Sequence, residues 1–208
     1  MRAVCRYRLL ATGHLLLAIC YLLISGCSLS IPRLGIGGRY LGGRDEFLKG
    51  RGGNMDKAVV ALETVVREDP TYKDSLTLLG RAYYRKGRYE DAGQILKRAL
   101  AVNNEDEIAW IILGLTQLRL RENQKGLETL KGGITLLIKV STDGYRDYPD
   151  WDSKGLVRRL VRRTVVLLSK GLDERNKIIR AVETLLIRLD DEESFQRQDT
   201  VQEILGDR

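Results

Sequence analysis

The sequence predicts an all-α fold in which helical hairpins stack into a right-handed solenoid and a final helix pair caps its end. Residues recur at intervals of 34: Leu62, Leu96 and Leu130 form one series, and Gly80 recurs as Gly114. The apolar residues between these positions follow the spacing of amphipathic helices. Small residues allow close helix contact, and the leucines fill the space between neighbouring helices. Because one hairpin cannot bury its apolar face alone, about three are needed for a stable stack.

The clearest repeat runs from Lys73 to Asp106. Its expected packing positions are Leu76, Leu79, Gly80, Tyr83, Tyr89, Ala92, Leu96 and Ala99. This pattern and its period resemble the tetratricopeptide repeat (TPR), a binding module built from helix pairs. The next unit, 107–140, keeps Trp110 but has Gln117 where an aromatic residue is usual. Before the clear repeat only a second helix, 55–68, is in good order, so the repeats are predicted over 55–140.

Residues 27–54 are rich in glycine, and we expect them to form a flexible tether because glycine is entropically costly to order. The first helix of the first repeat would fall in this stretch, so it is predicted to be absent or frayed. A phosphate-binding loop is the alternative. No Lys-Ser or Lys-Thr follows the glycines and no Gly-x-Gly-x-x-Gly register fits, which disfavours it.

The N-terminus predicts a signal peptide over 1–26. Arg2, Arg6 and Arg8 precede a short apolar run, and the run ends in small residues before Cys27. The tetrapeptide Ile-Ser-Gly-Cys resembles the lipobox of bacterial lipoproteins, in which the cysteine carries diacylglycerol and an acyl chain such as palmitate. By that resemblance, Ser28 favours the outer membrane and a periplasmic location. A plain signal peptide and an uncleaved membrane anchor are the alternatives.

The composition excludes several chemistries from the predicted mature chain. The only histidine, His14, and the other two cysteines, Cys5 and Cys20, lie in the predicted signal peptide. Ser-His-Asp and Cys-His catalysis and ordinary zinc sites are therefore removed. We expect no enzyme activity, cofactor or metal. The mature chain would carry 32 basic and 28 acidic residues, and a net charge of +4 is too small to indicate nucleic-acid binding.

The C-terminal third predicts a loop over 141–155 and two helices, split near Gly171, within 156–208. The aspartates of the loop do not match the spacing of a calcium-binding loop. A polar, acidic tail is expected after Asp190, with a short helix around 201–205. The helix pair is expected to cap the solenoid with a solvated polar face. Alternatively, the arginines near its start bind anionic lipid or an acidic partner; these are Arg158, Arg159, Arg162 and Arg163.

The resemblance implies a concave groove, lined by the first helix of each repeat, that binds protein partners. The predicted partner-binding residues are Arg81, Tyr84, Arg85, Ile111, Leu115, Leu118 and Arg119. A basic, aromatic half beside an apolar half would suit a peptide with acidic and apolar side chains. Packing of these residues under the C-terminal helices is the alternative.

Three functions are compatible with these features. We favour a lipid-anchored scaffold or adaptor that assembles or localises a complex of the bacterial cell envelope. The others are a structural subunit of a homo-oligomer and an enzyme of cell-wall metabolism, for which no carboxylate pair of defined spacing is visible.

Overall fold

A computed structural model describes residues 35–143 and 151–206 of the 208-residue chain. The predicted signal peptide, Cys27 and residues 28–34 lie outside the described residues. The helices are α2 (Gly35–Leu48), α3 (Met55–Glu68), α4 (Ser75–Arg85), α5 (Tyr89–Val102), α6 (Glu107–Arg119), α7 (Asn123–Asp143), α8 (Leu156–Ser169) and α9 (Arg175–Gly206). Two short 3-10 turns, η1 (Gly50–Gly52) and η2 (Gly171–Glu174), complete the order.

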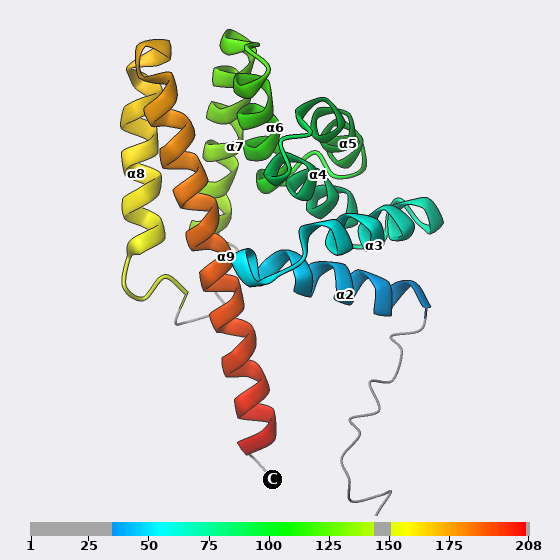
Figure 1. The fold of residues 1–208 in the computed structure, drawn as a ribbon. Coiled ribbons are helices and arrows are strands. Elements are labelled where there is room, and N and C mark those ends of the chain that lie inside the picture. Colours follow the sequence, from blue (N-terminus) through cyan, green and yellow to red (C-terminus); the bar gives the residue numbers. More distant parts are fainter. Residues whose placement is uncertain (1–34, 144–150, 207–208) are drawn as a thin grey trace, which may run out of the picture. The chain divides into compact units, whose positions relative to one another are not determined.

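Consecutive helices pack as hairpins that stack in chain order. The pairs are α2 with α3, α4 with α5, and α6 with α7, and each pair contacts the next (Figure 1). Helix α8 packs on α7, and α9 packs on α8 and also reaches α6. The described residues contain helices and turns and no strand, so the predicted all-α solenoid with a closing helix pair is confirmed.

Equivalent glycines in neighbouring hairpins hold the paired helices close together. A Cβ atom at Gly80 would lie 2.6 Å from Leu96 Cγ, and one at Gly114 would lie 2.7 Å from Leu130 Cγ. Real Cβ atoms do not approach other atoms so closely, because interiors are packed at van der Waals distance. The 34-residue period in the sequence therefore corresponds to one repeated helix contact.

Helix α2 corrects the prediction of a flexible tether over 27–54. Residues 35–48 are helical, and Tyr40 and Phe47 are buried on the face that packs against α3. A Cβ at Gly43 would lie 3.0 Å from Leu62 Cγ, so this glycine permits the contact. Tyr40 also donates a hydrogen bond to Asp74 at the start of α4. Burial of two large aromatic side chains offsets the entropic cost of ordering the glycines.

The first hairpin is out of register with the other two, so the 34-residue period does not extend to its first helix. Leu62 follows Gly43 by 19 residues, whereas Leu96 follows Gly80 by 16. The difference equals the three residues of η1, which lengthen the connection between α2 and α3. Counting back 34 residues from the packing positions of α4 therefore does not give the packing positions of α2.

The loop predicted over 141–155 is shorter than expected, because α7 continues to Asp143. Residues 144–150 are outside the described part. Asp152 is 3% exposed and accepts hydrogen bonds from the backbone N–H groups of Val157 (2.9 Å) and Arg158 (3.0 Å). Gly155 takes the left-handed conformation, with φ of 64°, directly before α8. Asp152 thus satisfies free N–H groups at the start of α8.

Helix α9 corrects the prediction of a polar tail after Asp190. The helix is continuous from Arg175 to Gly206. Its first half is held by buried apolar residues: Ile178, Ile179, Val182, Leu185, Leu186 and Leu189. Asp190, and Glu193 within the predicted tail, pair with arginines of the repeat helices.

Candidate partner-binding cleft

A cleft with a volume of about 330 Å³ lies where α4, α5 and α6 face α9. Its lining consists of Arg81, Tyr84 and Arg85 of α4, Tyr89 of α5, Ile112 and Arg119 of α6, and Glu183, Leu186 and Ile187 of α9. The wall is thus partly cationic and aromatic and partly aliphatic. Helix α9 supplies one side of a surface that the repeats alone would leave open.

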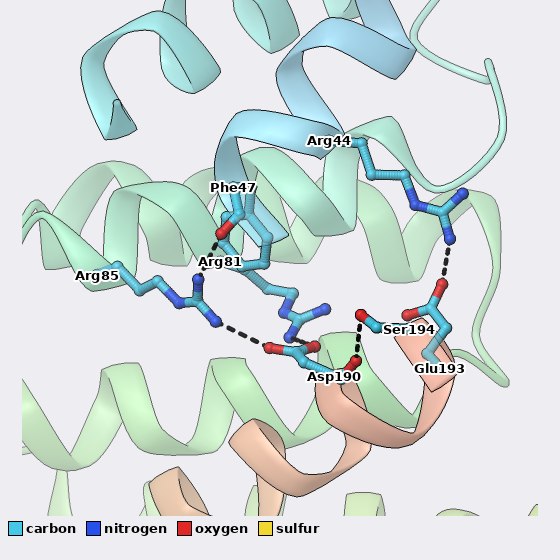
Figure 2. Close-up of polar contacts among 7 residues, drawn as sticks. All are labelled: Arg44, Phe47, Arg81, Arg85, Asp190, Glu193 and Ser194. Carbon is cyan, nitrogen blue, oxygen red and sulfur yellow. Dashed lines mark hydrogen bonds and ion pairs between the residues drawn. The ribbon is translucent and has the colours of Figure 1, made fainter. Parts of the chain in front are cut away.

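Two of the arginines that line the cleft share a carboxylate of α9. Asp190 of α9 pairs with Arg81 and with Arg85, whose Nη2 lies 2.8 Å from Asp190 Oδ2 (Figure 2). The side chains of Arg81 and Asp190 are only 11% and 13% exposed. A charge pair removed from water to this extent must be satisfied by its partners, so Asp190 fixes the position of α9 on α4.

The ring of Phe47 of α2 contacts the same two arginines. The guanidinium carbons of Arg85 and Arg81 lie 3.8 Å and 4.8 Å from the centre of its ring. Arg85 Nη1 also donates to the carbonyl oxygen of Phe47, at 2.9 Å. Burial lowers the pKa of Arg85 from its ordinary value, although Asp190 opposes this effect. The cation–π contacts hold both guanidinium groups against α2.

Further along α9, Glu183 holds the aliphatic part of the cleft in place. Tyr84 Oη donates to Glu183 (2.6 Å), Arg119 Nη2 donates to the same carboxylate (2.7 Å), and Arg119 Nε donates to Tyr84 Oη (3.2 Å). Burial raises the pKa of Tyr84 above its ordinary value, so the hydroxyl remains protonated and acts as a donor. The hydrogen bond that Arg119 donates to Tyr84 Oη stabilises the cationic form of the guanidinium and raises the pKa of Arg119.

The cleft carries a net positive charge. Three guanidinium groups, from Arg81, Arg85 and Arg119, face two carboxylates, from Asp190 and Glu183. The side chains of Arg85 and Arg119 remain 31% and 36% exposed. An additional carboxylate could therefore approach both, and Ile187, which is 55% exposed, would offer it an apolar neighbour.

The structure brings together four of the seven residues predicted to bind a partner. Arg81, Tyr84, Arg85 and Arg119 line the cleft. The remaining three are fully buried in the core, each with an exposure of 0%: Ile111, Leu115 and Leu118. Their prediction as contact residues is wrong for this arrangement, because the solenoid packs both faces of α6 against other helices. Arg81 lines the cleft but is engaged by Asp190.

Sequence reasoning missed the residues that α9 and α5 contribute. These are Tyr89, Ile112, Glu183, Leu186 and Ile187. One signal was present: Glu183 and Asp190 are seven residues apart, so they lie on one face of a helix. That acidic face complements the basic positions of α4 and α6, which would have indicated that α9 lies in the groove.

Comparison with known proteins gives a match to a family of helical repeats. Residues 52–118 match the family model described as tetratricopeptide repeat. The match covers α3 to α6, and α2, whose register differs, lies before it. No curated protein matches the sequence.

The hairpins of α2 to α7 are consistent with a tetratricopeptide-repeat solenoid, and residues 52–118 are similar to that repeat family. Proteins with such repeats are generally non-catalytic scaffolds for protein–protein interaction. Over the described residues, no helix combines the length and hydrophobicity needed to cross a bilayer. Within the same residues, no group of three or more His, Cys, Asp or Glu is placed to hold a metal ion.

Proposed function

We propose that the protein is a lipid-anchored adaptor of the bacterial cell envelope, which binds protein partners and helps to assemble or localise an envelope complex. The tetratricopeptide-repeat solenoid supports the adaptor role. The order of basic, apolar and small residues before Cys27 supports the lipid anchor. Ser28 after the cysteine supports an outer-membrane location facing the periplasm.

The observation that carries the proposal is the cleft between the repeats and α9. It combines a surplus of positive charge with the ring of Tyr89 and the exposed side chain of Ile187. A partner segment that carries a carboxylate beside an apolar side chain matches this lining. The apolar contact would supply affinity, and Arg119 and Arg85 would orient the carboxylate.

The cleft is tested by crosslinking in cells followed by mass spectrometry, with wild type and two single variants. Ile187→Glu places a carboxylate at the rim of the cleft, where it repels an acidic partner and removes the apolar contact. Val60→Glu makes the same change at an exposed site of α3 outside the lining, since Val60 is 63% exposed. We expect Ile187→Glu to lose the partner crosslinks and Val60→Glu to keep them. Retention by both variants would show that the partner binds elsewhere.

The anchor is tested separately by metabolic labelling with palmitate and fractionation of membranes. We expect wild type to incorporate label, and Cys27→Ser to incorporate none and to retain its leader. If Cys27→Ser is processed and stays fully membrane-bound, the anchor at Cys27 is wrong. Ser28→Asp tests the destination, because it should shift the protein towards the inner-membrane fraction.

A further inference from the structure

Helix α8 has an outer surface that the cleft does not use. It contacts α7, α9 and η2, and it forms an outer layer of the described unit (Figure 1). Its inner face buries Val157, Val161, Thr164 and Leu168. Between Leu156 and Ser169 there are four arginines and no acidic residue. The charged residues of α8 are therefore all positive.

The four arginines on this face are exposed, and within the part of the chain that the structure describes only one of them forms an ion pair. Arg158 pairs with Asp152, at 3.2 Å. No ion pair within the described residues involves Arg159, Arg162 or Arg163. At 100° per residue, Arg159 and Arg162 project opposite the buried Val157.

Aliphatic side chains lie among these charges. Val165 and Val166 are 42% and 55% exposed. Helical spacing places Val166 between Arg159 and Arg162 on the outermost line of the helix. The face therefore combines guanidinium groups with apolar contact area, as surface-bound amphipathic helices do.

We propose that this face of α8 docks on an anionic phospholipid surface with the helix axis parallel to the membrane. Guanidinium groups bind phosphate through paired N–H donors, and the valines would reach the boundary with the acyl chains. This inference depends on the proposed lipid anchor in one respect: the anchor would keep the protein close to a bilayer. It is independent of the cleft.

The size of the face favours a lipid surface over an acidic protein. A helix of 14 residues presents a strip of roughly 20 Å by 10 Å. This is about a quarter of the area that each partner buries in a stable protein interface. The strip is also convex, whereas specific recognition concentrates affinity in pockets. Binding to a bilayer requires neither a large specific interface nor a pocket, because the arginines are attracted to many anionic head groups at once.

The test uses the chain from Ser28 to Arg208, which lacks Cys27 and keeps the compact unit Leu34–Arg208 whole. Co-sedimentation is measured with vesicles of phosphatidylcholine alone and with vesicles that also contain phosphatidylglycerol. We expect binding only to the anionic vesicles and a decline as salt is added. The triple variant Arg159→Gln, Arg162→Gln, Arg163→Gln should lower the partition coefficient roughly 100-fold, because each cation at such a surface contributes about fivefold.

A charge-matched control removes three exposed basic residues from other helices: Lys97→Gln, Arg98→Gln and Lys131→Gln. We expect it to bind within a few-fold of wild type. Circular dichroism and thermal unfolding establish that both triple variants are folded. Val166→Glu, at an exposed site, should also weaken binding.

Three outcomes would overturn the proposal. The first is equal binding to both kinds of vesicle. The second is an equal loss of vesicle binding in the two triple variants. The third is the absence of vesicle binding together with crosslinks from α8 to an acidic protein. Since the tested chain has no lipid anchor and an intact cleft, these outcomes are distinct from failure of palmitate labelling or of the cleft crosslinks.

Discussion

Arg81 of the second hairpin and Asp190 of the last helix form an ion pair in which both side chains are nearly removed from water, at 11% and 13% exposure. They are 109 residues apart in the sequence. Arg85 joins the same carboxylate, and both guanidinium groups lie over the ring of Phe47 (Figure 2). This cluster connects the first hairpin, the second hairpin and α9.

Replacing Asp190 with Asn should lower the free energy of unfolding by about 2–3 kcal/mol, because two arginines lose their charged partner while Arg81 stays largely buried. The measurement is urea unfolding followed by circular dichroism. Asp191→Asn is the matched control, since Asp191 is 57% exposed and pairs with Arg188 of its own helix. Its effect should be below about 0.5 kcal/mol. Equal effects of the two variants would mean that the Asp190 cluster does not hold α9.

Gly114→Ala should destabilise the protein by about 1–3 kcal/mol or more, because overpacking forces helices apart. The new Cβ would lie 2.8 Å from the backbone nitrogen of Leu130, and a backbone atom cannot move aside as a side chain can. Gly132→Ala in α7 is the control, since no atom lies within 4 Å of its Cβ position. It should stabilise the helix by up to about 1 kcal/mol. Thermal unfolding of both variants decides whether close helix contact is required.

Phe47→Ala tests whether α2 belongs to the fold. Phe47 is fully buried, so truncation should cost about 3–5 kcal/mol. Leu41→Ala on the same helix should cost less than about 1 kcal/mol, because Leu41 is 43% exposed. Chemical denaturation distinguishes them. If residues 35–48 acted as a tether, neither change would matter.

Acidification should weaken the connection between α2 and α3. Glu46 accepts a hydrogen bond from the backbone N–H of Asn54 and another from Lys49, both at 2.8 Å, and these hold the pKa of its carboxyl below the ordinary 4.5. A lowered folded-state pKa contributes stability above pH 4.5 that is lost as the pH falls through the folded value.

The comparison is between wild type and Glu46→Gln, unfolded at a series of pH values. Glutamine does not titrate, so the stability difference should be present at neutral pH and vanish in acid. A difference that stays constant with pH would contradict the role of the carboxylate.

The periodic part of the fold could be predicted because its cause is local. Gly80 and Gly114 occupy the same place in successive hairpins, and each is followed 16 residues later by the leucine that it contacts. The caps are local in the same way: Asn54 accepts from the N–H of Lys57, and Asp106 accepts from that of Ala109. Such signals repeat along the chain.

The cleft could be predicted only in part. Arg81, Tyr84, Arg85 and Arg119 follow from the repeat register, since the first helix of each pair faces the concave side. Residues on α9 have no repeat register, so their position depends on contacts with helices far away in the sequence. Ile111, Leu115 and Leu118 were predicted to bind a partner but are buried, because the repeat register indicates the direction of a side chain and does not indicate which helix covers it.

The residue pattern was sufficient to predict the helices of the repeats from residue 55 onwards, their stacking order and the basic character of the groove, because spacing along one helix sets which residues share a face. The order of α2 and the position of α9 against the groove could not be read from that pattern. Both depend on contacts between distant residues, such as Phe47 with Arg85 and Asp190 with Arg81. Glycine and acidic residues favour disorder locally, and burial and ion pairing with distant partners reverse that preference here.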